Sequence, residues 1–164
     1  MALLETGGAR RESAKPKGFT PKPKRNTMSD EEKNMCAKPG RISWNELVST
    51  NPKASGDFYG KLFGWQGQPF VPPGSPAGAP PYTLFKMQAG EEMGLAGMLQ
   101  APAPGIPTHW LPYVVVENAD QSLAKAVQLG AKALTAVMTI SEVGRIAVLE
   151  DPQGAVIGLH EPPK

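Results

Sequence analysis

The 164-residue sequence predicts an α+β fold made of two similar halves, each with one strand, one helix and three further strands. Polar residues near the two helices recur at one offset: Asn51 and Ser55 in the first half, Asn118 and Ser122 in the second. The segment GLAGMLQAP at 94–102 aligns with AVIGLHEPP at 155–163, which places Gly97 on Gly158. Two related halves of roughly 55 residues indicate a duplicated unit packed about a pseudo-twofold axis.

The strands of both halves are apolar and β-branched runs bounded by residues that favour turns. In the first half they are Arg41–Ser49, a short strand beginning at Trp65, Tyr82–Met87 and Met93–Leu99. In the second half they are His109–Glu117, Ala133–Ile140 and the two arms of a hairpin, Ile146–Leu149 and Val156–Leu159. A Pro/Gly-rich stretch, Gln66–Pro81, is predicted to be a loop.

Each helix is delimited by residues that favour helix ends. The first is predicted over 53–63, and the residues that delimit it are Thr50 or Asn51, Pro52 and Gly64. The second is predicted over 121–129, between the cap Asn118 and the terminating Gly130.

The hairpin near the end of the sequence indicates which side chains share a face. Its turn, Asp151–Gly154 (DPQG), has the residues of a type I turn. Because side chains alternate across a strand, Ile157 and Leu159 share an apolar face, whereas Gly158 and His160 share the other. The second face combines an open space with a polar group, as the wall of a pocket would.

Residues 1–40 are predicted to be a disordered basic lead, separate from one domain at 41–163 with modules at about 41–102 and 108–163. The lead carries nine Lys and Arg residues against five Asp and Glu, whereas residues 41–164 carry eight against ten. The lead is either a basic arm that contacts nucleic acid or an acidic partner, or a leader before an alternative start at Met28. Because the domain itself is not basic, nucleic acid is not expected as a partner.

The cellular setting is predicted from cysteine content and hydropathy. The single Cys36 excludes an intramolecular disulfide and suits a reducing compartment. No apolar run approaches the roughly 20 residues that a membrane helix needs. We therefore expect a cytoplasmic protein without a membrane partner.

Three groups of motifs together resemble the vicinal oxygen chelate superfamily, which includes glyoxalase I, bleomycin-resistance proteins and extradiol dioxygenases. They are NPKAS with FYGKLFGW after the first strand, LGAK in the second half, and LEDPQGAVIGL near the end. The resemblance covers about 41–163 and is closest to small bacterial glyoxalase-like proteins. It implies that two βαβββ modules curl together into one open eight-stranded cup.

The resemblance also implies where a divalent metal would be bound: one position on the first strand and one on the last strand of each module. The aligned residues are Trp44, Gly97, Leu111 and Gly158. None of them ligates such a metal through its side chain, so no metal and no other cofactor is predicted.

Glu46 and His160 are the candidate catalytic residues. Glu46 is predicted on an otherwise apolar strand face, where burial would raise the pKa of its carboxyl and make it a general base or a ligand acceptor. The alternatives are an ion pair with Arg145 or a position in water at the end of the strand. His160 is either its acid–base partner or an exposed residue. Shifting the alignment by two positions would recruit Glu46, Tyr113 and His160, with His109 nearby, as a site for Zn, Ni, Mn or Fe.

The leading functional hypothesis is a protein that binds a small apolar or aromatic molecule in its cup without the usual metal. The candidate ligand-binding residues are Trp44, Leu111, Tyr113 and Gly158, among which a flat ring could stack. One alternative is a metal-dependent lyase, isomerase or dioxygenase with the shifted site, and another is a regulatory or partner-binding module. Open strand edges and apolar surface would favour a homodimer.

Overall fold

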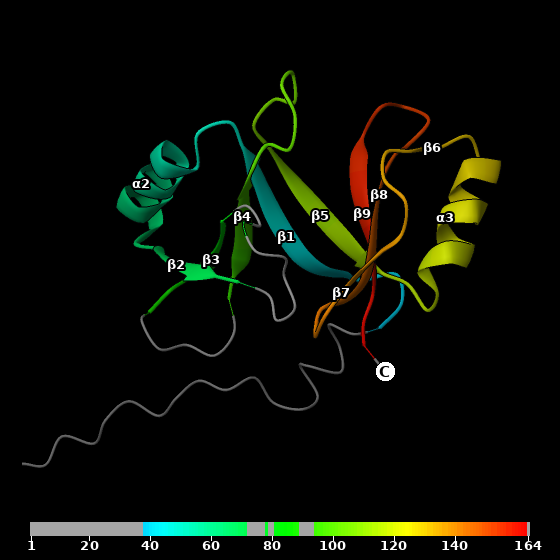
Figure 1. The fold of residues 1–164 in the computed structure, drawn as a ribbon, viewed down its shortest axis with the longest axis horizontal. Coiled ribbons are helices and arrows are strands. Elements are labelled where there is room, and N and C mark those ends of the chain that lie inside the picture. Colours follow the sequence, from blue (N-terminus) through cyan, green and yellow to red (C-terminus); the bar gives the residue numbers. More distant parts are fainter. Residues whose placement is uncertain (1–37, 72–77, 79–80, 89–93, 164) are drawn as a thin grey trace, which may run out of the picture.

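A computed structural model describes residues 38–71, 78, 81–88 and 94–163. The strands form one mixed sheet in the order β2-β3-β4-β1-β5-β9-β8-β6, with β7 paired to β8. Figure 1 shows the sheet curling between two helices, with α2 beside the first half, α3 beside the second, and β1 and β5 between them. This is the predicted α+β cup.

The order of elements within each half is the predicted one. The first half contains β1 (Ile42–Ser49), α2 (Pro52–Phe63), β2 (Gln66–Phe70), β3 (Tyr82–Lys86) and β4 (Ala96–Gln100). The second contains β5 (His109–Val115), α3 (Ala119–Gln128), β6 (Lys132–Ala133), β7 (Met138–Ile140), β8 (Gly144–Glu150) and β9 (Val156–Glu161). The turn between β8 and β9 is also as predicted, because the Gly154 N–H donates to the Asp151 carbonyl at 3.0 Å.

Strand pairing shows how the two halves meet. β1 is antiparallel to β5, and each of these strands is parallel to the last strand of its own half, β4 or β9. Across the β1–β5 boundary, Glu46 pairs with Leu111 and Trp44 pairs with Tyr113. The alignment of the two halves matches Trp44 with Leu111 and Glu46 with Tyr113, so it maps each of these pairs onto the other. The pseudo-twofold axis therefore passes between them.

Side-chain caps are present at the N-terminal ends of both helices. The Asn51 Oδ1 accepts from the Ala54 N–H at 3.1 Å, and the Asn118 Oδ1 accepts from the Gln121 N–H at 2.9 Å. Gly64 follows α2 with a φ of 75°, in the left-handed region that favours glycine. The predicted caps are therefore confirmed, with Asn51 rather than Thr50 as the first.

The two faces of the sheet have different roles. Beneath α2, a buried cluster joins Leu47, Phe85, Ala96 and Met98, with Tyr59 and Trp65 packed against it. α3 packs on β8 and β9, where the Glu161 Oε2 accepts from the Ala119 N–H at 2.9 Å. The helices thus cover the outer face, and the inner face, here called the cup face, carries a second cluster around Val48, Leu111 and Tyr113.

Two predicted elements differ from the structure. Gln66–Phe70 is not loop but strand β2, paired with β3; Pro69 is tolerated there because β2 is an edge strand and needs no outward N–H. The predicted strand Ala133–Ile140 is divided into β6 and β7, because the N–H groups of Leu134 and Thr135 both donate to the Val148 carbonyl. The sheet therefore has nine strands instead of eight.

Part of the chain lies outside the described residues. That part contains nearly all of the predicted lead, including Cys36, and most of the loop that follows β2. Within the described ranges, no helix combines the length and the apolar character needed to span a bilayer.

Candidate functional site

The candidate site is centred on the Glu46 side chain, which β1 places on the cup face. The Glu46 Oε2 accepts a hydrogen bond from the Tyr82 hydroxyl at 2.9 Å, and the Oε1 accepts one from the Tyr113 hydroxyl at 3.1 Å. The Trp44 Nε1–H donates to the Tyr82 hydroxyl oxygen at 3.1 Å. We call these four residues the Glu46 network. They come from β1, β3 and β5, so the network spans both halves of the protein.

The direction of the hydrogen bonds in this network is largely fixed by chemistry. An indole nitrogen can only donate, so the Tyr82 oxygen accepts from Trp44 and the single Tyr82 proton must go to the Glu46 Oε2. Tyr113 has no such constraint and can either donate to the Oε1 or accept from it. Glu46 can therefore take up a proton on the Oε1 without losing any hydrogen bond of the network.

The surroundings shift the pKa values of the network in one direction. Burial raises the pKa of the Glu46 carboxyl, and the hydrogen bonds from Tyr82 and Tyr113 offset this rise only in part. Burial, and then the Glu46 charge, raise the pKa of both tyrosyl hydroxyls well above the ordinary range. Both hydroxyls thus remain protonated donors at neutral pH.

Two glycines on the last strands make room for the network. Gly97 on β4 is the strand partner of Glu46, and Gly158 on β9 is the strand partner of Tyr113. A Cβ at Gly97 would overlap the Tyr82 hydroxyl, and a Cβ at Gly158 would overlap the Tyr113 ring. A tyrosine therefore occupies the space in front of each glycine.

The strand pairs also bear on where the metal positions of the superfamily fall in this chain. They place Glu46 opposite Gly97 and Tyr113 opposite Gly158, so a two-position shift on the first strands alone would pair these residues with the unshifted glycines of the last strands. On this register the four positions hold Glu46, Gly97, Tyr113 and Gly158. Trp44 and Leu111 lie two residues away on the same face.

These four positions do not fit a divalent metal. They offer one carboxylate, one phenol that stays protonated and two glycines, whereas such ions are held by several His, Cys, Asp or Glu side chains. Any longer side chain at Gly97 or Gly158 would have to displace a tyrosine. Over the described ranges, no group of three His, Cys, Asp and Glu residues is arranged to hold a metal ion.

His160 lies on the same face but is held by other partners. Its Nδ1 is 2.9 Å from the Ser43 Oγ, and its Nε2 is 2.8 Å from the Val143 carbonyl oxygen, to which it donates. Ser43 lies where the β1–β5 register shifts between Ile42 and Trp44. With both ring nitrogens engaged in this way, His160 shares no hydrogen bond with Glu46.

The remaining charged candidates also lie apart from the network. The Arg145 Nη1 is 2.6 Å from an oxygen of Asp120 and 3.4 Å from one of Glu161, so Arg145 joins β8 to α3 and β9 instead of pairing with Glu46. His109, at the start of β5, donates from its Nδ1 to the Pro107 carbonyl at 2.7 Å. Neither residue contacts the network.

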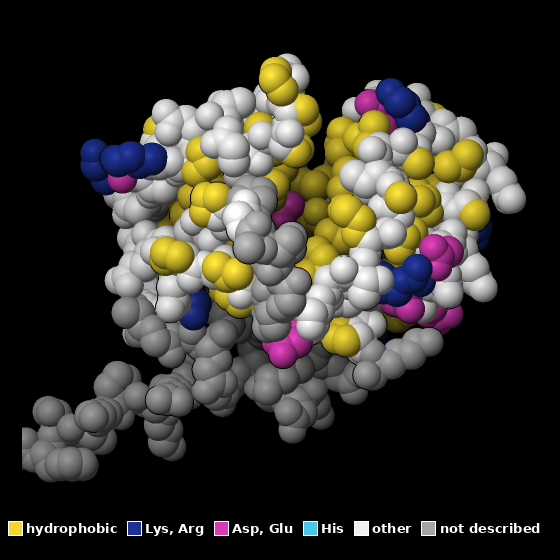
Figure 2. All heavy atoms as spheres, in the orientation of Figure 1, with side chains coloured by type: hydrophobic (Ala, Val, Ile, Leu, Met, Phe, Trp, Pro, Cys, Tyr) yellow, Lys and Arg dark blue, Asp and Glu magenta, His cyan; other side chains and the backbone are white. Residues whose placement is uncertain are grey.

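The cup is visible as a hollow between the two halves. Figure 2 shows mostly hydrophobic walls around it, with an acidic side chain inside. The walls come from the second cluster, in which Trp44, Leu99, Ala101, Ile106, Ile146, Val148 and Val156 pack around Val48, Leu111 and Tyr113. Glu46 itself is half-buried, so the residue is not sealed off from solvent.

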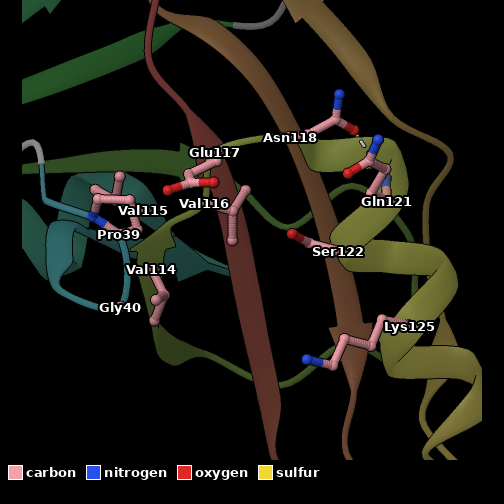
Figure 3. Close-up of a pocket in the computed structure, with 10 residues that line it drawn as sticks. All are labelled: Pro39, Gly40, Val114, Val115, Val116, Glu117, Asn118, Gln121, Ser122 and Lys125. Atoms are coloured by element: carbon pink, nitrogen blue, oxygen red, sulfur yellow. Dashed lines mark hydrogen bonds between the residues drawn. The ribbon is translucent and has the colours of Figure 1, made fainter.

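Two further surface cavities contain none of the network residues. One, of about 350 Å³, lies between α3 and the end of β5; Figure 3 shows Ser122 and Lys125 projecting from α3 toward it. The other, of about 560 Å³, lies between α3 and the segment 133–137. The chemistry of the candidate site is therefore that of the cup alone.

Comparison with known proteins identifies similar chains. The profile of a family described as the glyoxalase-like domain matches residues 46–160. A Mycobacterium bovis protein named "Putative glyoxylase CFP32" is 33% identical over 123 residues, which is 75% of this chain and 44% of that protein. The anthracycline biosynthesis protein DnrV of Streptomyces peucetius is 30% identical over 133 residues, 74% of this chain and 46% of that protein. This chain thus spans less than half the length of these relatives.

Solved structures support the fold. A Streptomyces coelicolor methylmalonyl-CoA epimerase, in complex with 2-nitronate-propionyl-CoA, aligns with a TM-score of 0.51 over 77% of this chain and 100% of that chain, at 16% identity. A Bacillus halodurans hypothetical protein, BH1468, aligns with a TM-score of 0.52 over 77% and 97%, at 11% identity. At such low identities the likeness concerns the fold alone.

Proposed function

Because this chain belongs to the glyoxalase-like domain family, within the vicinal oxygen chelate superfamily as its motifs predict, we propose that it binds a small, largely apolar molecule in its cup without a divalent metal. In this proposal the ligand body contacts the rings and aliphatic side chains around Trp44, Leu111 and Tyr113. One hydrogen-bond donor of the ligand is bound by the Glu46 carboxyl.

The Glu46 network is the observation that carries this proposal. A carboxyl on an otherwise apolar face gives a ligand one fixed polar contact, as is usual for small-molecule sites. The two tyrosyl hydroxyls hold the carboxyl in one orientation, and their own accepting or donating capacity is largely used within the network. Glu46 is therefore both positioned in advance and accessible.

Two observations support binding without the metal of the superfamily. The glycines at the last-strand positions leave space that Tyr82 and Tyr113 fill, and the only carboxylate among the four positions is Glu46. The alternative of a metal-dependent lyase, isomerase or dioxygenase would need further ligands, and His160 is engaged with Ser43 and Val143.

The experiment is a pair of measurements on protein purified without a histidine tag. After incubation with Zn, Ni, Mn or Fe(II) and dialysis, we expect metal content far below one ion per chain. In a thermal-shift screen of small aromatic compounds, we expect ligands that raise the Tm by mass action. The rise should be lost in Trp44→Ala and kept in Trp110→Ala, a matched control on the outer face of β5.

Near-stoichiometric metal that is lost in Glu46→Ala would overturn the proposal and restore the metal-dependent alternative. Ligands whose effect is the same in Trp44→Ala and the native protein would move the binding site out of the cup. The hypothesis of a regulatory module without a ligand would be favoured by a cup filled by Trp44 and Tyr113. Tyr113 is only 6% exposed, whereas Trp44 retains exposure, so binding of any screened compound in the cup is the result that would overturn this hypothesis.

A second candidate function, proton transfer on a bound ligand, is favoured by the freedom of the Glu46 Oε1. This oxygen can accept a proton while Tyr113 changes from donor to acceptor, so Glu46 has what a general base needs. For any ligand found in the screen, NMR in D₂O should show exchange of an acidic C–H that is fast in the native protein. The exchange should be lost in Glu46→Gln.

We further propose that the protein is cytoplasmic and forms a homodimer through exposed apolar side chains. The outer edges of the sheet offer little for pairing, because β2 contains Pro69 and β6 has only two residues. By contrast, Phe58, Leu62 and Phe63 on α2 are each more than half exposed. Light scattering of the native protein and of Leu62→Asp tests this, with a dimer expected only for the native protein.

A further inference from the structure

The charge of Glu46 has no positive counterpart in the described structure. Its two hydrogen-bond partners among the described residues are neutral hydroxyls. The ion pairs of Lys53 with Asp57 and of Arg145 with Asp120 and Glu161 do not include it. No described basic group contributes to its electrostatic environment. A half-buried carboxylate without a cation is costly, because low-polarity surroundings disfavour the charged form.

Other titratable side chains of this face lie toward its ends. By strand alternation and register they are Lys86 on β3, His109 on β5, Lys132 on β6, Glu150 on β8 and His160 on β9. His109 donates to the Pro107 carbonyl, and Lys132 lies beside Glu150 at the far border of the sheet. Lys86 already has a partner, and His160 is bound by Ser43 and Val143. The groups that directly face Glu46 are Tyr82 from β3 and Tyr113 from β5. None of these supplies the missing positive charge.

The Glu46 carboxyl also has room for further hydrogen bonds. Trp44, Tyr82 and Tyr113 are linked to it through hydrogen bonds, directly or through one hydroxyl, so three aromatic side chains lie next to one acceptor. A carboxylate has about four lone-pair sites, and the two tyrosines use only two of them.

We propose that the ligand of the cup is a protonated amine carried on an apolar body, with its ammonium group bound to Glu46. This inference rests on the proposed function, since it assigns the ligand class of that same site. The ammonium donates to the free lone pairs of Glu46 and balances its charge. The apolar body lies along the aliphatic wall around Leu111 and Val148.

The pairing couples binding to protonation. The pKa of the free Glu46 carboxyl is raised by burial, whereas a bound cation would favour the ionised form and lower that pKa. Binding of an amine should therefore release protons from Glu46 in the pH range where the free carboxyl is still partly protonated. The affinity for an amine should fall as the pH is lowered through that range, while the affinity for a neutral ligand should not.

The experiment compares two probes of nearly the same shape, 2-phenylethylamine and 2-phenylethanol, by calorimetry on the full chain. We expect the native protein to bind the amine about tenfold more tightly than the alcohol, a difference of about 1.4 kcal/mol. In Glu46→Gln the preference should disappear. Asp57→Asn, which removes an exposed carboxylate on α2, should retain the preference and thereby control for net charge. Repeating the titration in buffers of different ionisation enthalpy measures the released protons.

The outcomes distinguish failure of the amine inference from failure of the proposed function. If the alcohol binds as tightly as the amine and Trp44→Ala abolishes both, the amine inference is overturned and the proposed function stands. If neither probe binds in the cup, both are overturned for ligands of this size. If Glu46→Gln binds the amine as tightly as the native protein does, the cation is bound elsewhere. Unchanged circular dichroism of Glu46→Gln, in which the amide retains an acceptor and a donor, separates these results from misfolding.

Discussion

The two halves of the protein use the same backbone positions in different ways. In the first half, the strand pair is Glu46 and Gly97, and the space in front of the glycine is filled by Tyr82 from the neighbouring strand β3. In the second half, the strand pair is Tyr113 and Gly158, and the same space is filled by Tyr113 itself. One half thus supplies an acceptor and the other a donor, and the two meet at the pseudo-twofold axis.

This difference shows how a duplicated unit can lose one site and gain another. Two equal halves would place equal side chains on both sides of the axis. Here the axis instead joins unlike partners, because Glu46 accepts from Tyr113 across the β1–β5 boundary. A hydrogen bond between halves also means that the network forms only when both halves are folded and paired.

The largest expected effect comes from adding a methyl group at Gly158, and the matching change at Gly97 should have a smaller effect. Gly158→Ala should cost about 3 kcal/mol of unfolding free energy, because its Cβ meets ring atoms of Tyr113, which is only 6% exposed. Gly97→Ala should cost less, about 1.5 kcal/mol, because its Cβ meets the outer end of the half-exposed Tyr82. Urea unfolding of both variants measures the difference.

A matched double variant identifies the cause. If the Tyr82 hydroxyl end is what an alanine at 97 displaces, then Gly97→Ala should cost little in a Tyr82→Leu background. Equal costs of Gly97→Ala in both backgrounds would show that the backbone requires glycine at position 97, and that space for the Tyr82 hydroxyl is not the reason.

The next effect distinguishes the two tyrosines. Tyr82→Phe removes a hydroxyl that both donates to Glu46 and accepts from Trp44, so it should cost about 2 kcal/mol. Tyr113→Phe removes a single hydrogen bond and should cost about 1 kcal/mol. Chemical denaturation measures both values. A larger cost for Tyr113→Phe would contradict the asymmetry of the network.

The smallest effect is a dependence of stability on pH. Because the pKa of Glu46 is higher in the folded protein than its ordinary value of 4.5, the folded protein holds the proton longer than the unfolded chain does. Stability should therefore fall as the pH rises from that value through the folded pKa. Glu46→Gln lacks this loss. The unfolding free energy of the native protein minus that of the variant should therefore fall as the pH rises from 4.5 through the folded pKa of Glu46. A difference that rises with pH would contradict burial as the dominant cause.

The sequence located most of the fold and about half of the site. Capping residues such as Asn118 and the Asp151–Gly154 turn act locally, so their structure follows from neighbouring residues. The alternation along β1 likewise placed Glu46 and Trp44 on one face. The strand Gln66–Phe70 was missed because its Pro and Gly content resembles a loop, and only its edge position explains why it pairs.

Tyr82 and Ser43 could not be found in the same way. Tyr82 meets Glu46 across β4, and that meeting depends on two strand registers and on the absence of a side chain at Gly97. Ser43 meets His160 because the ladder between β1 and β5 is irregular there. Neither residue carries a local signal, since both contacts join segments far apart in sequence.

The two outer strands of the sheet have a consequence for the behaviour of the chain in concentrated solution. An exposed strand edge can recruit the edge of another molecule and start a growing cross-β stack. Pro69 removes one N–H from β2, and β6 presents only two residues before the chain departs from the ladder. β7, which also pairs with β8 at this border, has only three residues. The described borders therefore offer little uninterrupted edge for such a stack, even though apolar side chains are exposed on the helices.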